Sequence, residues 1–278
     1  MNVILADCAG ACYGVQRALD LANEAALQHD SIQTLGPLIH NPQVVRELSE
    51  KGISVAEDVA DIQANTVIIR SHGVSPEVLD AIEAKQLDLI DATCPHVLRA
   101  QRAAYDLAAK GHTVLIIGEA QHPEVHGLLA WAKRGGNEVY CISDANDLPG
   151  GLAEPLGIVV QTTQTRELLQ SVLDALENRG LNYELHDTIC SATSKRQQAA
   201  AQLAQNVDAM VVIGGKNSSN TTHLAEICSQ YCRNVFHIES VSELDKHFFE
   251  GIDTVGITAG ASTPDKQINA VVDCLHSW

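Results

Sequence analysis

The feature that most restricts the fold of this chain is an internal repeat. In each copy, an apolar, strand-like segment leads to a cysteine, and a helical pattern follows. The copies read VILADCAGACYGVQRALDLANEAA, LDLIDATCPHVLRAQRAAYDLAAKG and YELHDTICSATSKRQQAAAQLAQ, with the cysteines at Cys12, Cys94 and Cys190. Because repeated sequence units fold as repeated structural units, we expect the three cysteines to occupy equivalent positions.

Two more strand–helix units complete each copy. The second units are IQTLGPLIHNPQVVREL, TVLIIGEAQHPEVHGLL and AMVVIGGKNSSNTTHLAEIC. Their helices begin at a polar residue, His40, His122 or Asn220, which lies 28, 28 or 30 residues after the cysteine. The third units, such as TVIIRSHGVSPEVLDAIEAK, end their strands on His, Thr or Ser.

Strands that alternate with helices of this length predict parallel sheets joined by right-handed crossovers. We therefore predict an α/β protein of three similar small domains, residues 1–93, 94–188 and 189–278, around a pseudo-threefold axis. Parallel sheets bind ligands beyond the carboxyl ends of their strands, where helix N-termini offer free N–H groups. The cysteines and the repeated polar residues all fall at that end, so we expect them to line one central cavity.

Composition excludes several classes of function. The 35 acidic and 18 basic residues give a net charge of −17, which repels nucleic acids and anionic membranes. Aromatic residues make up only 4% of the chain, too few for platforms that stack nucleic acid bases. We find no secretory leader and no apolar run of ~18 residues, and we expect a cytoplasmic protein.

Three thiolates at helix starts predict a soft metal site, because the helix dipole favours the ionised thiol. An iron–sulfur cluster with three cysteine ligands has one open iron, which indicates chemistry at that iron. Zinc also accepts three thiolates and a water, so the residues alone leave both metals possible. Three buried structural cysteines are the simplest alternative, and their recurrence in the repeat argues against it.

Five cysteines lie outside this pattern: Cys8, Cys141, Cys228, Cys232 and Cys274. Cys8 is a rival to Cys12 as the first ligand, but only Cys12 directly precedes a helical pattern. We expect Cys228 and Cys232, four residues apart on one helix, to pack in the core.

Residues that bind phosphate recur beside the cysteine units. His40 and His122 precede proline at helix starts, and His72 ends a strand. The third copy has Ser218, Ser219, Asn220 and Ser262 at the matching positions. Together these groups predict a diphosphate site inside an acidic protein.

Glu124 lies two residues after His122, where a carboxyl group removed from water can hold and pass a proton. The alternative is an ordinary first-turn glutamate that complements the helix dipole.

Eight motifs in order resemble the 4-hydroxy-3-methylbut-2-enyl diphosphate reductase family, also called IspH or LytB. They are Cys12-Tyr13-Gly14-Val15, Arg70-Ser71-His72-Gly73-Val74, Asp91-Ala92-Thr93-Cys94-Pro95, His122-Pro123-Glu124-Val125, Gln161-Thr162-Thr163, Asp187-Thr188-Ile189-Cys190, Asn217-Ser218-Ser219-Asn220 and Gly260-Ala261-Ser262-Thr263-Pro264. The resemblance covers essentially the whole chain.

The resemblance implies a [4Fe–4S] cluster on Cys12, Cys94 and Cys190 whose open iron binds the substrate oxygen. It implies that an allylic diphosphate is reduced to isopentenyl and dimethylallyl diphosphate in the last step of the methylerythritol phosphate pathway, with ferredoxin or flavodoxin as electron donor. The implied diphosphate ligands are His40, His72, His122, Ser218, Ser219, Asn220 and Ser262. Thr162 and Thr163 would hold the hydroxyl end, and Glu124 would deliver protons.

The chain departs from the usual family pattern at two positions. Tyr13 replaces a small or apolar residue, and Gln164 replaces leucine. Both flank implied ligands.

Two other functions use the same residues. A non-redox [4Fe–4S] dehydratase of the quinolinate synthase type would use the open iron only as a Lewis acid. A regulatory iron–sulfur protein without turnover would explain the cysteines but not the anion-binding residues around Glu124.

Overall fold

The computed structural model describes residues 1–278 and forms two compact units. The first, here called the terminal unit, contains residues 1–15, 40–43 and 191–278. The second, the central unit, contains residues 16–39 and 44–190.

Three parallel four-stranded sheets form the framework of these units. The sheet of the terminal unit has the order β1 (Asn2–Leu5), β12 (Thr254–Ala259), β10 (Ala209–Ile213) and β11 (Asn234–Ile238). The central unit has one sheet of β5 (Asp88–Asp91), β4 (Thr66–Ile69), β2 (Ile32–Leu35) and β3 (Ile53–Ala56), and another of β9 (Tyr183–His186), β8 (Leu156–Val160), β6 (Thr113–Ile117) and β7 (Val139–Ile142). The predicted α/β fold with three similar parallel sheets is confirmed.

Nine α-helices connect the strands: α1 (Tyr13–Gln28), α2 (Pro42–Glu50), α3 (Pro76–Ala84), α4 (Pro95–Ala109), α5 (Pro123–Arg134), α6 (Arg166–Asn178), α7 (Ser191–Ala204), α8 (Ser219–Tyr231) and α9 (Asp265–His276). Short 3₁₀ turns cover Val59–Asp61, Ala145–Asp147, Val241–Glu243 and Lys246–Phe249. Helices α2 to α5 begin with proline, whose missing N–H costs nothing in the first turn.

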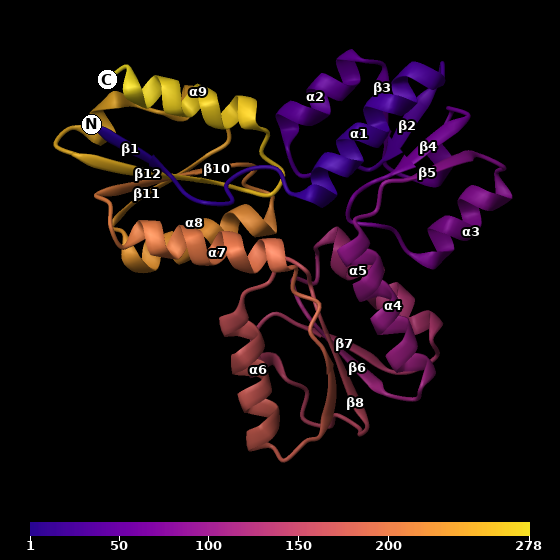
Figure 1. Cartoon of the computed structure of the whole chain (residues 1–278). Helices are drawn as coiled ribbons and strands as arrows, with labels where there is room; N and C mark the ends of the chain where they lie inside the picture. Colours follow the sequence, from indigo (N-terminus) through magenta and orange to yellow (C-terminus); the bar gives the residue numbers. More distant parts are fainter. The chain divides into compact units, whose positions relative to one another are not determined.

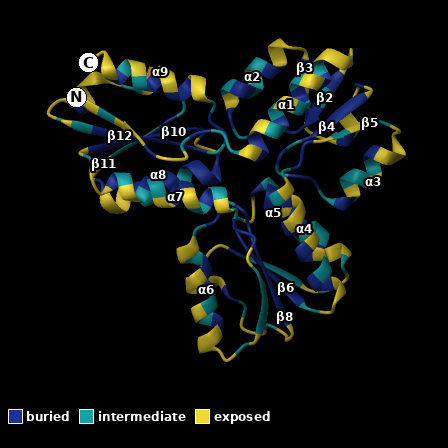
Figure 2. Ribbon diagram, in the orientation of Figure 1, coloured by how far each residue is buried: buried dark blue, intermediate teal, exposed yellow.

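The sheet of the terminal unit is covered by helices on both faces. In the terminal unit, α9 lies on one face of the sheet and α7 and α8 lie on the other (Figure 1). Val211 and Ile213 of β10 pack in the cluster that contains α9, whereas Met210 and Val212 pack in the cluster with α8. This alternation follows from the two-residue period of a strand. The central strands β10 and β12 are accordingly buried, whereas the edge strand β1 and the outer helix faces are largely exposed (Figure 2).

The strand before each repeated cysteine is an edge strand. β1 pairs with β12, β5 with β4, and β9 with β8, each time beside the last strand of a repeat. The expected first domain, residues 1–93, therefore includes a strand, β1, that belongs to the third sheet. The domain boundaries at residues 93 and 188 remain predictions.

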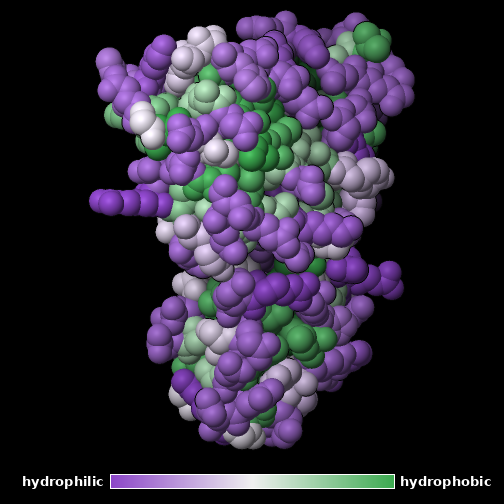
Figure 3. Space-filling view, turned by 60° about the vertical axis from the view of Figure 1, so that its left-hand side comes forward, coloured by the Kyte–Doolittle hydropathy of each residue, from purple (hydrophilic) through white to green (hydrophobic).

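Cys228 and Cys232 are buried in the cluster between α8 and the sheet, as expected. Polar side chains cover most of the face shown in Figure 3, with smaller apolar areas between them. No helix combines the length and the apolar character needed to cross a membrane.

Close packing of α4 against α5 gives a test of the fold. A Cβ atom added at Gly135 would lie 2.6 Å from Cβ of Ala108 and 2.7 Å from the carbonyl oxygen of Tyr105. We expect Gly135→Ala to lower the free energy of unfolding by about 1–3 kcal/mol, because the helix backbones must separate. Urea unfolding measures this value.

Gly150→Ala is the matched control, since a Cβ atom there meets nothing within 4 Å. An equal loss of stability in both variants would contradict the close contact between α4 and α5.

Candidate active site

The three repeated cysteines occupy equivalent backbone positions. Each peptide N–H donates to a carbonyl oxygen two residues beyond the end of the neighbouring strand: Cys12 to Ala261 at 3.0 Å, Cys94 to Ser71 at 2.9 Å and Cys190 to Thr162 at 3.0 Å. Each cysteine directly precedes a helix, α1, α4 or α7. The equivalence predicted from the repeat is confirmed.

The thiols of these cysteines suit a soft metal. All three are partly exposed, and each lies at the start of a helix. By contrast, burial raises the pKa of the Cys228 thiol to about 12, with a smaller contribution from Cys232. A group that needs three thiolates therefore fits the repeated cysteines and not the buried pair.

Arg17 supports the segment that leads to Cys94. Its guanidinium donates to the carbonyl oxygens of Asp91 and Thr93, both at 3.2 Å. The Asp91 carboxylate in turn accepts the N–H of Thr93 at 2.8 Å. Arg17 lies five residues after Cys12, but nothing in the sequence marks the two carbonyl oxygens that it contacts.

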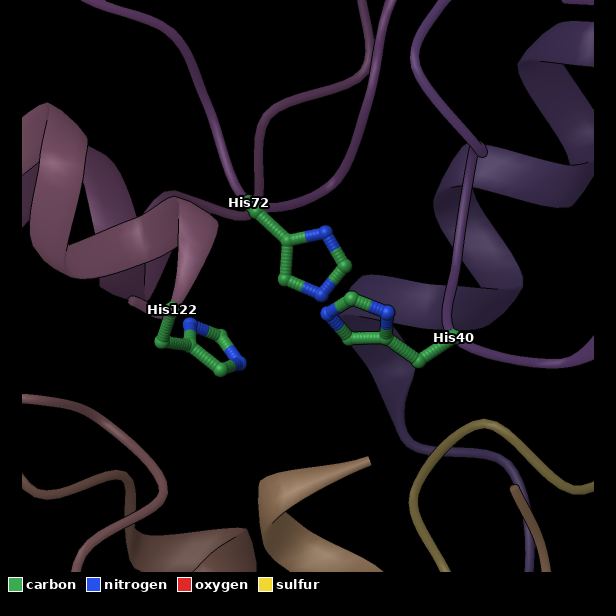
Figure 4. Close-up of side chains that lie close together, drawn as sticks. All are labelled: His40, His72 and His122. Carbon is green, nitrogen blue, oxygen red and sulfur yellow. The ribbon is translucent and has the colours of Figure 1, made fainter. Parts of the chain in front are cut away.

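His72 and His122 lie together in the central unit. Their ring centroids are 5.5 Å apart in an edge-to-face arrangement. Both imidazoles are drawn in Figure 4, with His40 of the terminal unit. Nδ1 of His122 accepts the N–H of Glu124 at 3.1 Å, so a neutral His122 ring carries its proton on Nε2.

Glu124 is almost completely buried, with 1% of its surface exposed. Its carboxylate accepts the N–H of Thr162 at 2.6 Å and the Thr162 hydroxyl at 2.8 Å. Burial raises the pKa of Glu124 to about 7, the two hydrogen bonds from Thr162 oppose this effect, and the charge of Glu119 adds slightly to it. The side chain is thus an internal acid that titrates near neutral pH, and not an exposed first-turn glutamate.

Gln161 holds the residues around Thr162 in place. Its side-chain oxygen accepts the N–H of Glu119 at 2.9 Å, and its side-chain nitrogen donates to the Thr163 hydroxyl at 3.0 Å. It therefore connects the end of β8 to the segment before His122. Gln164 stands where the family pattern usually has leucine. It is buried and donates to the same Gln161 oxygen at 3.5 Å. The other departure, Tyr13, is 72% exposed.

The terminal unit brings its own polar residues together around the start of α8. Ser218 caps this helix, and Ser219 and Asn220 begin it. The Ser262 hydroxyl donates to the carbonyl oxygen of His40 at 3.1 Å. Asn41 donates to the carbonyl oxygen of Ser262 at 2.9 Å.

Asn220 is a buried residue whose side-chain amide has no hydrogen-bond partner. Only 3% of its surface is exposed, and neither its amide nitrogen nor its amide oxygen has a hydrogen-bond partner. A buried amide without partners is costly, so a bound polar ligand explains its place.

The expected site residues thus form two groups. The central unit contains Cys94, Cys190, His72, His122, Glu124, Thr162 and Thr163, and the terminal unit contains Cys12, His40, Ser218, Ser219, Asn220 and Ser262. A single cavity formed by both groups remains a prediction.

The fold and these residues define a class of protein: a parallel α/β protein with three equivalent thiols, anion-binding groups at strand ends and one buried acid. The chain belongs to the LytB protein family, which matches residues 3–276.

Individual relatives agree with this assignment. The chain is 46% identical to the 4-hydroxy-3-methylbut-2-enyl diphosphate reductase of Syntrophotalea carbinolica, over 98% of both chains. It is 44% identical to the enzyme of that name from Geobacter sulfurreducens, over 100% of this chain and 98% of the relative.

Two solved structures are also similar. One is (E)-4-hydroxy-3-methyl-but-2-enyl diphosphate reductase, the terminal enzyme of the non-mevalonate pathway, with 40% identity, full coverage of both chains and a TM-score of 0.73. The other is the E-1-hydroxy-2-methyl-but-2-enyl-4-diphosphate reductase of Plasmodium falciparum, with 27% identity, 99% and 87% coverage and a TM-score of 0.91.

The raised pKa of Glu124 predicts how stability depends on pH. Between the ordinary value of 4.5 and about 7, the folded chain keeps a proton that the unfolded chain has released. The free energy of unfolding therefore falls as pH rises through this range, by on the order of 3 kcal/mol, and stays lower above it. We expect Glu124→Gln to remove this fall. Urea unfolding of both proteins between about pH 5 and about pH 8 measures the difference.

Glu167→Gln serves as the control because Glu167 is an exposed glutamate in the first turn of α6. If wild type and Glu124→Gln show the same pH dependence, Glu124 titrates at its ordinary pKa and the interpretation is wrong.

Proposed function

We propose that this protein is a 4-hydroxy-3-methylbut-2-enyl diphosphate reductase. It takes two electrons and two protons, breaks the allylic C–O bond of (E)-4-hydroxy-3-methylbut-2-enyl diphosphate, and releases water with isopentenyl or dimethylallyl diphosphate. The observation that carries this proposal is the buried Glu124–Thr162 pair, whose Thr162 carbonyl accepts the N–H of Cys190. The relatives are named as reductases, and their names do not favour the alternative of a non-redox dehydratase.

A [4Fe–4S] cluster on Cys12, Cys94 and Cys190, with one open iron, is the cofactor of this proposal. The family is one of iron–sulfur enzymes, and the three equivalent, partly exposed thiols suit such a cluster. When bound, the cluster supplies electrons one at a time and a Lewis-acidic iron. The protein's own share is to hold the thiolates, bind the substrate and move protons.

The diphosphate group is the part of the substrate that the polar residues suit. His72 and His122 offer ring N–H groups from the central unit. The terminal unit contributes His40, Ser218, Ser219, Asn220 and Ser262, including the partnerless Asn220 amide. These groups supply anion affinity in a protein with a net charge of −17.

Proton delivery follows from the Glu124–Thr162 contact. At neutral pH the carboxyl group exists in both protonation states, because its pKa is about 7. As a carboxylate it accepts the Thr162 hydroxyl, and as an acid it can donate to that oxygen instead. The Thr162 hydroxyl can then donate its own hydrogen to the leaving oxygen, so the pair moves a proton without a charged group entering the site. Thr163 beside it positions the hydroxyl end of the substrate.

Replacement of Glu124 by glutamine tests the proton role. Glutamine keeps the shape and hydrogen bonding of the side chain but has no acidic proton at neutral pH. We expect turnover of the allylic diphosphate with excess chemical reductant to fall by roughly 10²–10⁴-fold. The change in the cluster spectrum on adding substrate should persist, since binding does not need the proton. Turnover within a few-fold of wild type would assign the proton to another group.

The cluster assignment is tested by iron and sulfide analysis of anaerobically purified variants. We expect Cys12→Ser, Cys94→Ser and Cys190→Ser each to prevent stable cluster assembly. Cys8→Ser and Cys274→Ser should keep full iron and sulfide content, because both cysteines lie outside the repeat. A full cluster in Cys12→Ser together with loss in Cys8→Ser would show that Cys8 is the first ligand.

A further inference from the structure

A two-electron reductase needs a source of electrons, and the distribution of charge indicates where that source docks. Each repeated cysteine is followed five residues later by a base: Arg17, Arg99 or Lys195. Arg17 is engaged with backbone carbonyls, whereas Arg99 and Lys195 are exposed. Arg99 forms no ion pair or hydrogen bond, so its charge is available to a partner.

The helix that carries Arg99 has more bases than acids. Helix α4 contains Arg99 and Arg102 and a single acid, Asp106, which forms an exposed ion pair with Arg102 at 3.7 Å. Helix α3, which precedes it, contains three acids and no base. Helix α7, which follows Cys190, also carries more bases than acids, but only α4 combines its bases with exposed large apolar side chains.

The outer face of α4 combines these cations with exposed apolar side chains. Leu98 is 42% exposed and Tyr105 is 38% exposed. Leu98, Arg102 and Tyr105 are spaced by four and three residues and therefore lie on one stripe, with Arg99 beside it. The opposite face is buried against α5 and the sheet. Arginine and aromatic residues around an apolar centre are typical of protein interfaces.

The position and size of this face suit electron transfer. Arg99 follows Cys94 by five residues, about 8 Å along the helix axis. The 15-residue helix is about 22 Å long, and weak electron-transfer complexes use small interfaces.

We propose that the exposed face of α4, formed by Leu98, Arg99, Arg102 and Tyr105, is the docking surface for a small acidic protein that carries one electron at a time. This inference rests on the proposed reductase function. Opposite charge steers such a partner to the helix, and the apolar residues exclude water at the centre of contact.

The test uses anaerobic holoprotein and an acidic [2Fe–2S] ferredoxin as the probe. The double variant Arg99→Glu with Arg102→Glu reverses the charge of the face. Arg233→Glu with Lys246→Glu changes the net charge of the protein by the same amount at exposed positions outside α4. Binding of oxidised ferredoxin is measured by surface plasmon resonance at low and high salt.

We expect the α4 variant to bind ferredoxin roughly tenfold or more weakly at low salt, and the control variant to stay within about threefold of wild type. The difference should disappear at high ionic strength, where charges are screened. Equal loss in both variants, or no loss in either, would overturn the proposed docking surface. Because binding needs no turnover, this result stands whether or not the reductase function does.

Turnover measured with two electron donors distinguishes a failure of the docking surface from a failure of the proposed reductase function. With ferredoxin as the sole donor, we expect the α4 variant to be at least tenfold slower, whereas with dithionite and methyl viologen it should match wild type. Loss with both donors would show that α4 affects the chemistry and not docking. Inactive wild type with the chemical reductant would instead contradict the proposed function.

Discussion

One backbone hydrogen bond, made three times, fixes the positions on which the proposed chemistry depends. The N–H of each repeated cysteine donates beyond the end of the neighbouring parallel strand, and a helix begins at the next residue. The cysteine backbone is therefore held by the sheet before it and by the helix after it. Because these contacts are made by the backbone, the three cysteines share a backbone position although their neighbours in sequence differ.

The same hydrogen bond connects the repeated cysteines to the polar residues proposed to bind the substrate. Ser71, which accepts from Cys94, precedes His72, and Thr162, which accepts from Cys190, also donates to Glu124. A displacement of either cysteine would therefore move His72 or Glu124 as well. In the central unit, the residues proposed for metal binding, substrate binding and proton transfer are connected by one short set of contacts.

Much of this arrangement was predictable from the sequence because the repeat is regular. The parallel sheets, the equivalent cysteines and the core positions of Cys228 and Cys232 all follow from periodicity and spacing. The pairing of β1 with the third sheet was missed because strand partners far apart in sequence leave no local signal. Arg17 and Gln161 were missed for a related reason: each acts on backbone atoms, and no residue pattern marks a carbonyl or N–H that needs a partner. The pKa of Glu124 depends on burial, which the motif around it does not reveal.

The place of β1 has a consequence for how the protein is made. Its hydrogen-bonding partner β12 ends at Ala259, so the first strand to leave the ribosome must wait for almost the last one before it can join a sheet. The central unit, residues 16–39 and 44–190, has no such delay in its sheets. Cys12 lies seven residues after the end of β1, and its N–H donates to Ala261 beyond β12. The first of the three repeated cysteines to be synthesised is therefore the last to reach its backbone position.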